Sequence, residues 1–217
     1  MDFFPSYSEF NKKLQNQQNQ IVYTKFSADL DTPVSLMQKL AKNEKNSFLL
    51  ESVTGGEIKG RYSVIGMKPD LIWKCNLKHS EINRNVLKNS NNFIKQKITP
   101  IKSLKSLIKE SYVKIPDNLP AMSAGLFGYL SYEMINFIKK VSNFSNNDLN
   151  LPQSILFRPS IIIIVDNVKG EIIIINPVWI SNNNLNNISS KKLYNHSKKS
   201  LINIIDIISN STNSYNF

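Results

Sequence analysis

Two isoleucine-rich runs joined by a short polar turn restrict the fold of this chain more than any other feature. The runs are Ser160 to Val165 and Glu171 to Ile175, and Asp166 to Gly170 lies between them. β-branched residues favour strands, and a turn of this composition, with Gly170 available for a positive φ, is typical of a β-hairpin. Because both runs are apolar throughout, we expect both faces of these strands to be buried, and we expect Asn176-Pro177 to end the second strand.

Three shorter apolar runs upstream predict further strands. Phe48 to Leu50 forms the first, and Arg61 to Gly66 and Leu71 to Cys75 form the other two. Lys68-Pro69-Asp70 has the composition of a turn, so we expect it to separate the last two strands. This part of the chain is therefore predicted to be sheet.

Cap signals predict two helices. Thr32 suits the N-cap and Pro33 the first helical position, where its missing N–H costs nothing, and this helix should end near Asn43. Thr99-Pro100 repeats the signal before an apolar stripe at helical spacing that runs to about Tyr112.

A third helix and a linker are expected at the end of the chain. After an Asn-rich stretch from Asn186, apolar residues recur at the spacing of an amphipathic helix, at Leu193, Leu201, Ile204, Ile205 and Ile208. Ser209 to Phe217 has the composition of a linker. We therefore predict one domain over residues 1–208 and the start of a linker over residues 209–217.

Composition and the lack of targeting signals indicate the cellular compartment of this protein. With 217 residues, of which 41% are hydrophobic, the chain can bury a real core. The single cysteine, Cys75, rules out a disulfide framework and lies in an apolar run, where a small buried side chain is the simplest interpretation. The first residues lack the pattern of a signal peptide, and the apolar runs are shorter than the roughly 20 residues of a membrane-spanning helix. We expect a cytoplasmic protein without membrane contact.

The net charge of +11 does not predict a nucleic-acid interface. Of the 27 basic residues three are arginine, and the lysines are spread along the chain without a dense block or an aromatic platform. Catalytic motifs are equally absent, since His79 and His196 are isolated and the sequence holds no zinc-binding, nucleophile-elbow or phosphate-loop string. We expect this chain to bind no nucleic acid and no metal or cofactor.

One segment has the chemistry of a binding site. Glu51 and Ser52 lie at the end of an apolar strand, Gly55-Gly56 can form a flexible turn, and Arg61 returns a positive charge. A carboxylate and a hydroxyl can accept from an ammonium group, and a guanidinium can donate to a carboxylate, so the set suits a zwitterion. A structural ion pair between Glu51 and Arg61 that pins a hairpin explains the spacing as well. The spacing leaves both interpretations open.

The strings around this segment resemble a known family. Phe48-Leu-Leu-Glu-Ser-Val-Thr-Gly-Gly-Glu57, with Gly60-Arg-Tyr-Ser63 behind it, is similar to the signature of the amino-terminal domain of anthranilate synthase component I and of aminodeoxychorismate synthase component I. The similarity runs from about Pro5 to about Trp179. It continues, in the family's order, through Glu81-Ile-Asn-Arg84, Gly125-Leu-Phe-Gly-Tyr-Leu-Ser-Tyr-Glu133, Phe157-Arg-Pro-Ser160 and Asp166-Asn-Val-Lys169.

The resemblance implies an α+β fold in which antiparallel sheets pack as a sandwich with a few flanking helices. It implies a lyase subunit that converts chorismate and ammonia to anthranilate and pyruvate, with Mg²⁺ at the chorismate site and a glutamine amidotransferase subunit, component II, as partner. In the family the chorismate and metal residues lie in a carboxy-terminal domain whose motifs this sequence lacks. We therefore expect the chain to be inactive by itself.

The resemblance also implies that this domain binds L-tryptophan, the feedback inhibitor. Carried over by position, Glu51 accepts from the ammonium of tryptophan, Ser52 hydrogen-bonds it, and Leu50 packs against the indole. Arg61 is placed near the same pocket.

The string from Gly125 to Glu133 is interpreted as structural. Its two glycines allow close backbone packing, and Tyr129 and Tyr132 are expected to face the core or the domain interface.

Two alternatives share the same residues. The aminodeoxychorismate synthase component serves folate synthesis, and its distinguishing residues lie mainly in the carboxy-terminal half. A free-standing amino-acid-binding module without an enzyme partner would need a surface without large apolar patches.

Overall fold

The computed structural model describes residues 1–27, 31–42, 44–53, 59–76, 78–137, 139, 151–180 and 189–210, with backbone alone for Val53 and Lys59. Within these residues no helix is long and apolar enough to cross a membrane. The predicted Gly55-Gly56 turn and most of the Asn-rich stretch after Asn186 lie outside the described residues.

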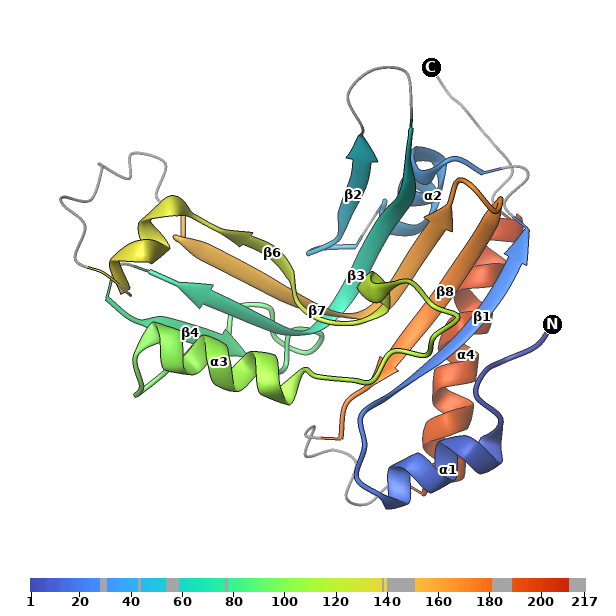
Figure 1. The fold of residues 1–217 in the computed structure, drawn as a ribbon, viewed down its shortest axis with the longest axis horizontal. Coiled ribbons are helices and arrows are strands. Elements are labelled where there is room, and N and C mark those ends of the chain that lie inside the picture. The colour runs from blue at the N-terminus through green and yellow to red at the C-terminus, as the bar shows by residue number, and fades with distance from the viewer. Residues whose placement is uncertain are drawn as a thin grey trace. The chain divides into compact units, whose positions relative to one another are not determined.

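Helices combine with antiparallel strands in an α+β arrangement, which confirms the predicted fold class (Figure 1). The described strands form one eight-stranded sheet in the order β1-β8-β7-β3-β4-β5, with β2 paired to β3 and β6 paired to β7. The helices are α1 (Tyr7–Gln15), α2 (Pro33–Ala41), α3 (Pro100–Glu110) and α4 (Ser190–Asn210), with short 3-10 turns η1 (Ala121–Ser123) and η2 (Tyr132–Phe137). The strands are β1 (Gln20–Ser27), β2 (Phe48–Val53), β3 (Lys59–Cys75), β4 (Ser80–Asn83), β5 (Ile94–Lys95), β6 (Phe127–Leu130), β7 (Ser154–Asp166) and β8 (Glu171–Val178).

The chain divides into two compact units. Unit 1 comprises residues 1–68, 113–124 and 160–217, and unit 2 comprises residues 69–112 and 125–159. The long strands β3 and β7 each contribute residues to both units. Neither unit is therefore a continuous stretch of sequence.

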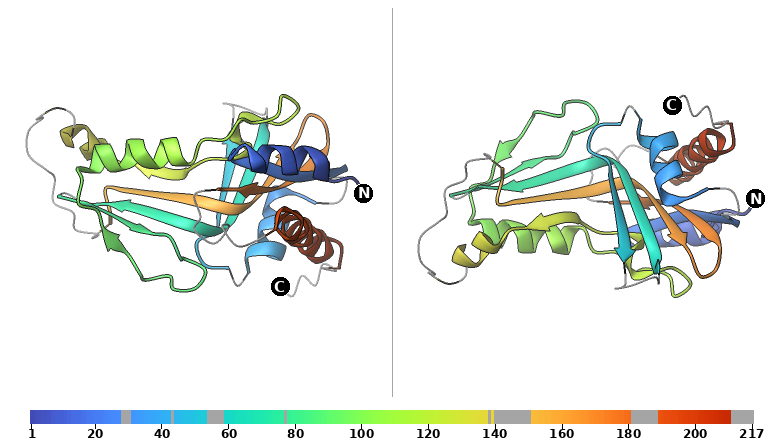
Figure 2. Two further views of the ribbon diagram at one scale, coloured as in Figure 1. Left: turned by 90° about the horizontal axis from the view of Figure 1, so that it is seen from below. Right: turned by 90° about the horizontal axis from the view of Figure 1, so that it is seen from above.

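The core of unit 1 lies between one face of its strands and the helices. Alternate residues of β7 and β8 supply Ile163, Val165, Ile172 and Ile174, and α4 supplies Leu201 from the other side. Helices α1 and α4 lie side by side (Figure 2), and the hydroxyl of Tyr194 on α4 donates to the carbonyl of Pro5 at 2.7 Å. Burial of these aliphatic side chains is the main force that holds the unit together.

The central hairpin forms as predicted. β7 and β8 pair antiparallel from Ile162 opposite Ile175 to Asp166 opposite Glu171, and Gly170 takes a φ of +62° in the turn. Residues 161–165 and 172–175 are buried, as expected for strands covered on both faces. The predicted end at Asn176-Pro177 is wrong, because β8 continues to Val178 by pairing with β1 after its pairing with β7 has stopped.

The predicted break at Lys68-Pro69-Asp70 is also wrong. β3 is one strand from Lys59 to Cys75, and the irregularity is confined to a φ of +52° at Lys68. The Lys68 carbonyl accepts a hydrogen bond from the hydroxyl of Ser160 at 2.6 Å, so a side chain on β7 satisfies the backbone where the strand is irregular.

Both predicted cap positions are confirmed as N-caps, but with different contacts. The Thr32 hydroxyl accepts from the Ser35 backbone N–H at 3.1 Å, whereas Thr99 makes no side-chain capping bond before α3. α4 extends to Asn210, two residues into the expected linker, and residues 211–217 lie outside the described part.

Unit 2 has a smaller core of its own. Trp73 is fully buried, and its indole N–H donates to the hydroxyl of Ser103 on α3 at 2.9 Å. Cys75 is fully buried beside it, and burial raises the pKa of its thiol to about 11. The interpretation of Cys75 as a small apolar side chain is therefore confirmed.

The glycine-rich string in unit 2 has the structural role predicted for it at Gly128. This glycine has a φ of +151°, and a Cβ there would lie 1.9 Å from the carbonyl oxygen of Ile155 on β7. Of the two placements expected for Tyr129 and Tyr132, the core is wrong, because they are 41% and 79% exposed, and the domain interface stays a prediction. The hydroxyl of Tyr129 donates to the carbonyl of Pro152 at 2.6 Å.

Candidate functional site

The predicted ligand residues Leu50, Glu51 and Ser52 lie together on β2. Leu50 is 51% exposed, and Glu51 and Ser52 are also exposed. An exposed leucine followed by two exposed polar residues on a strand leaves apolar and hydrogen-bonding surface available at one place.

β2 is an edge strand among the described strands, since it is hydrogen-bonded to β3 alone. In an antiparallel pair every second residue points its N–H and C=O away from the partner strand. The outer edge of β2 therefore presents backbone donors and acceptors together with the three side chains.

The register between β2 and β3 decides which way each side chain points. Leu49 pairs with Ile65 and packs on the unit 1 core, and Glu51 pairs with Ser63 on the same face. Leu50 pairs with Val64 on the opposite face, which strand alternation assigns to Ser52 as well. A ligand that contacts all three must lie along the free edge, where side chains of both faces are within reach.

Ser52 lies at an irregularity of this pair. The register shifts between Glu51 opposite Ser63 and Val53 opposite Lys59, so β3 carries two more residues than β2 across this step. Gly60 approaches Ser52 so closely that a Cβ at residue 60 would lie 2.3 Å from the Cβ and the carbonyl oxygen of Ser52. Such bulges re-aim side chains at functional edges.

Arg61 forms a salt bridge with Asp166, at the start of the β7–β8 turn, at 3.0 Å between Nη2 and Oδ2. Its Nε donates to both carboxylate oxygens, at 3.2 and 3.3 Å. The guanidinium also stacks on the ring of Tyr62, 4.8 Å from the ring centroid. The structural pair considered for Arg61 thus exists, but with Asp166 in place of Glu51.

The Asp166 carboxylate is buried and accepts hydrogen bonds from both Arg61 and the β7–β8 turn. Its side chain is 3% exposed, and it also accepts from the backbone N–H groups of Val168 and Lys169 at 3.1 and 3.2 Å. Burial alone would raise the pKa of Asp166, but the hydrogen bonds from Arg61 and the turn outweigh it and hold the pKa below its ordinary value. The hydrogen bond to Asp166 raises the pKa of Arg61 in turn.

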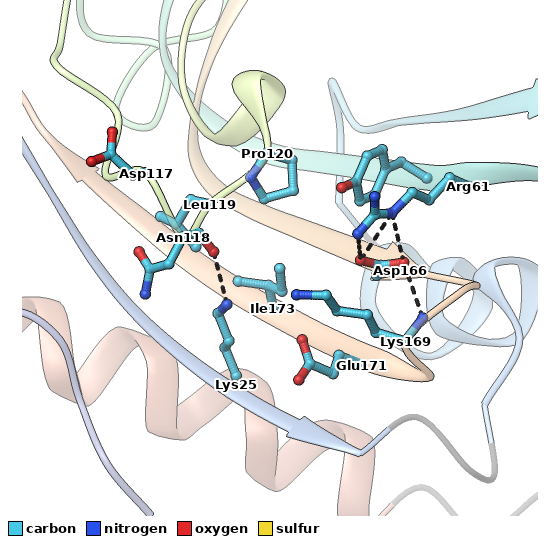
Figure 3. A pocket seen from close by; sticks show the side chains of 11 residues that line it. Lys25, Arg61, Asp117, Asn118, Leu119, Pro120, Asp166, Lys169, Glu171 and Ile173 are labelled. Atoms are coloured by element: carbon cyan, nitrogen blue, oxygen red, sulfur yellow. Dashed lines mark hydrogen bonds and ion pairs between the residues drawn. The ribbon is translucent and has the colours of Figure 1, made fainter.

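A pocket of about 270 Å³ opens beside this pair, within unit 1 (Figure 3). It lies on the face of the sheet opposite the core, since Ile173 on its floor alternates with the core residues Ile172 and Ile174. Its lining comes from β1, β3, the β7–β8 hairpin and the segment before η1, namely Lys25, Arg61, Tyr62, Asp117, Asn118, Leu119, Pro120, Asp166, Lys169, Glu171 and Ile173.

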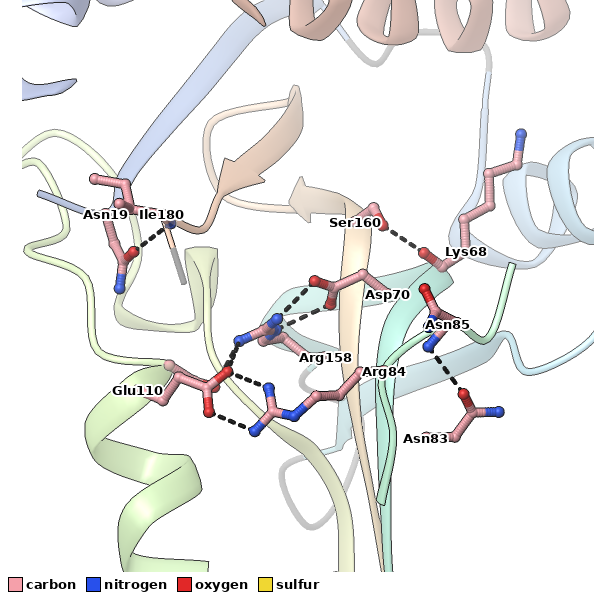
Figure 4. A network of polar contacts seen from close by, with 11 residues as sticks. Asn19, Lys68, Asp70, Asn83, Arg84, Asn85, Glu110, Arg158, Ser160 and Ile180 are labelled. Carbon is pink, nitrogen blue, oxygen red and sulfur yellow. Dashed lines mark hydrogen bonds and ion pairs between the residues drawn. The ribbon is translucent and has the colours of Figure 1, made fainter. Parts of the chain in front are cut away.

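A second polar cluster lies in unit 2 and is structural (Figure 4). Arg158 is 1% exposed, and it donates to Asp70 at 2.6 and 2.9 Å and to Glu110 at 3.2 Å. Arg84 donates to the same Glu110 from the exposed side, at 2.7 Å between Nη2 and Oε2. These bonds tie β3, β7, α3 and the residue after β4 together, and they satisfy the buried guanidinium.

Sequence reasoning placed Leu50, Glu51 and Ser52 on one strand, and it missed Asp166 as the partner of Arg61. The string Asp166-Asn-Val-Lys169 was interpreted as a turn and as part of the family resemblance, without a role for the carboxylate, although an aspartate that begins a hairpin turn commonly accepts from the next backbone N–H groups. Asp117 and Lys25 carried no sequence signal. Among the described residues, no group of three or more His, Cys, Asp or Glu side chains is placed to hold a metal ion.

No model of a known protein family matches the chain. Individual relatives do match it. The chain is 48% identical over 176 residues to anthranilate synthase component 1 of Cereibacter sphaeroides. The matched part is 81% of this chain and 35% of the relative. It is 32% identical over 155 residues to the protein of that name from Pseudomonas putida. This match includes 69% of this chain and 31% of the relative. This chain is homologous to the amino-terminal part of anthranilate synthase component 1.

The chain spans about a third of the length of the anthranilate synthase relatives that it matches. The solved structure of anthranilate synthase component I from Streptococcus pneumoniae superposes with a TM-score of 0.55 at 17% identity, covering 87% of this chain and 37% of that one. At that identity the likeness concerns the fold alone, and it agrees with the α+β arrangement described above.

Proposed function

We propose that this chain is the regulatory, tryptophan-sensing part of an anthranilate synthase large subunit, with L-tryptophan bound along the free edge of β2. One observation carries the proposal. Leu50, Glu51 and Ser52 are exposed together on an edge strand, in a chain whose relatives are anthranilate synthase component 1.

The edge geometry suits a zwitterion with a large apolar side chain. Outward-pointing backbone groups of β2 offer a donor to the carboxylate and an acceptor to the ammonium, and the Glu51 carboxylate adds a charge-assisted bond to the ammonium. Leu50 offers apolar surface to the indole from the opposite face. Ser52 supplies a hydroxyl at the bulge.

Arg61 has a different role in this proposal from the one its charge first indicated. Its Nε and Nη2 are used by Asp166, and its guanidinium lies against the ring of Tyr62. It therefore supports the β3 bulge opposite Ser52 and offers at most its remaining donors to a ligand. Loss of Arg61 should weaken tryptophan binding less than loss of Glu51.

The remaining parts of the reaction are assigned outside this chain. We propose that chorismate, Mg²⁺ and the catalytic residues belong to a carboxy-terminal domain, that an amidotransferase component II supplies ammonia, and that this chain alone is inactive. The similarity to anthranilate synthase component 1 described above favours the tryptophan pathway over the folate alternative.

The test is a calorimetric titration of L-tryptophan into the 217-residue chain, with L-phenylalanine as the matched competitor. The same titration is made on a chimera that joins this chain to the carboxy-terminal two thirds of the Cereibacter sphaeroides relative, with anthranilate formation as a second readout. We expect Glu51→Gln and Leu50→Ala to abolish tryptophan binding and inhibition while turnover of the chimera persists.

Asp206→Asn, on the exposed side of α4, serves as the control for the loss of a carboxylate. A chimera that is active but insensitive to tryptophan, together with no binding to the isolated chain, would overturn the proposal. Normal inhibition of the Glu51→Gln chimera would overturn the assignment of Glu51 alone.

A further inference from the structure

The turn between β7 and β8 contacts β3 at its bulge, residues 60–62, which lie opposite Ser52 alone on β2. Two consecutive turn residues make the contact. Asp166 forms the salt bridge with Arg61 described above (Figure 3), and the backbone N–H of Asn167 donates to the carbonyl of Arg61 at 2.8 Å. The bulge is therefore bound from the side that faces away from β2.

The side chain of Asn167 adds a bond that its own turn does not need. Its Nδ2 donates to the carbonyl of Gly60 at 2.9 Å, although 107 positions separate the two residues. Asparagine in a turn usually hydrogen-bonds the backbone of that same turn. Here an exposed side chain bonds a distant strand instead, so its amide stabilises β3.

Hydrogen bonds within the turn fix the position of Asn167. The Asp166 carboxylate accepts from the backbone N–H groups of Val168 and Lys169 at 3.1 and 3.2 Å. The Asp166 carbonyl accepts from the N–H of Gly170 at 2.9 Å. Asn167 lies inside these bonds, so its amide is presented to β3 from a well-held backbone.

Asn167 binds two consecutive carbonyls of β3, those of Gly60 and Arg61. In a regular ladder the consecutive carbonyls of one strand point to opposite neighbours, so the partner strand on either side receives every second one. Here the hairpin receives both. The departure coincides with the register shift of β2 at Ser52, which indicates that the hairpin and the bulge depend on each other.

Gly60 passes this contact on to Ser52. A Cβ at residue 60 would lie 2.3 Å from the Cβ, the Oγ and the carbonyl oxygen of Ser52, so the two residues are packed without a gap. We propose that Asn167 is a positioning residue of the tryptophan site: its side chain holds the bulge, and the bulge sets the position of the Ser52 hydroxyl. This inference rests on the proposed function, since Ser52 is a ligand residue only there.

The experiment is a cycle of variants in the chain and in the chimera described above, with L-tryptophan binding measured by calorimetry. Asn167→Ala should weaken tryptophan binding about two- to tenfold, the usual effect of one hydrogen bond. The same change made in Ser52→Ala should have no further effect, because its influence passes through the Ser52 hydroxyl. Losses that add in the double variant would overturn the inference.

Asn176→Ala is the matched control. Asn176 on β8 also donates from Nδ2 to a backbone carbonyl, that of Ser160 at 2.7 Å, and both residues belong to unit 1 but not to β2 or the bulge. It should leave tryptophan affinity unchanged even if it lowers the melting temperature as much as Asn167→Ala does. Equal weakening of tryptophan binding by both variants would indicate a general loss of stability, and the positioning role would be wrong.

Nuclear magnetic resonance without tryptophan separates this inference from the proposed function. The backbone amide signals of Glu51 and Ser52 should shift in Asn167→Ala and stay in place in Asn176→Ala. Unshifted signals in Asn167→Ala would refute the inference whatever the tryptophan titrations give. Shifted signals in a chain and a chimera that do not bind tryptophan would refute the proposed function and leave the influence of Asn167 on Ser52 standing.

Discussion

Ser52 and Gly60 face each other across β2 and β3 so closely that residue 60 has no room for a side chain. A Cβ at residue 60 would lie 2.3 Å from three atoms of Ser52, one of which is its backbone carbonyl oxygen. The hydroxyl proposed to bind tryptophan is thus placed by the absence of a side chain on the neighbouring strand.

Gly60→Ala should therefore displace Ser52 and its strand. We expect a loss of about 1–3 kcal/mol in the free energy of unfolding, because the clash involves backbone and cannot be relieved by a rotamer change. Tryptophan binding should weaken with it. Urea unfolding measures the first effect, and Gly170→Asn is the control, since Gly170 has nothing within 4 Å of a Cβ and asparagine tolerates its φ of +62°. A Gly60→Ala chain as stable as the control would contradict the observed spacing.

Gly125 and Gly128 form a matched pair in unit 2. Both have a positive φ, of +136° and +151°, but a Cβ at Gly128 would lie 1.9 Å from the Ile155 carbonyl oxygen, whereas one at Gly125 meets nothing within 4 Å. Gly125→Ala should lower the free energy of unfolding by the backbone strain alone, about 1–3 kcal/mol. Gly128→Ala should lower it by about 1–3 kcal/mol more, because of the clash. Thermal melts of the two variants compare them directly, and equal melting temperatures would refute the distinction.

Arg158 and Arg84 share Glu110 but differ in burial. Arg158 is 1% exposed and Arg84 has a side chain that is 48% exposed. Arg158→Met should lower the free energy of unfolding by about 3–5 kcal/mol, because it removes the bidentate ion pair with Asp70. Arg84→Met should cost less than about 1 kcal/mol, as solvent screens the exposed pair. Denaturant midpoints test the ranking, and the reverse order would count against a structural role for the network.

Acid should weaken unit 1 through Asp166. Its pKa in the folded chain lies below its ordinary value of 3.8, so its contribution to stability is complete above that pH and is lost as the pH falls through the folded pKa. The difference in unfolding free energy between the native chain and Asp166→Asn should be constant from neutral pH down to about pH 4 and should shrink below it. Urea titrations at several pH values measure this difference. A difference that grows in acid would show that the sign is wrong.

Much of this fold was predictable because its signals are local. The hairpin follows from β-branched runs around Asp166 to Gly170, and α2 follows from Thr32 and Pro33. The errors arise where a neighbouring strand decides the outcome. β8 passes Pro177 because β1 pairs with it there, and β3 passes Pro69 because a positive φ at Lys68 absorbs the irregularity.

The candidate site was predictable only in part, for the same reason. Leu50 to Ser52 are consecutive, so any strand brings them together. The partner of Arg61 lies 105 residues further along the chain, and the pocket unites residues from Lys25 to Ile173. Which carboxylate faces a given arginine depends on the register of distant strands, and spacing along the sequence carries no information about it.

The interleaved course of the two units sets an order of assembly on the ribosome. All residues of unit 2 have been synthesised by Pro159, whereas the core of unit 1 needs α4, whose buried residues end at Ile208. The rings of Phe10 and Tyr194 are tilted to each other with their centroids 5.1 Å apart, although the two residues lie far apart in the sequence, so α1 must wait for its partner until α4 has been synthesised. Contacts of such long range slow folding, and domains tend to fold as units during synthesis. The later-closing unit is the one that carries β2, so the proposed tryptophan site is not supported by a folded unit until α4 has been made.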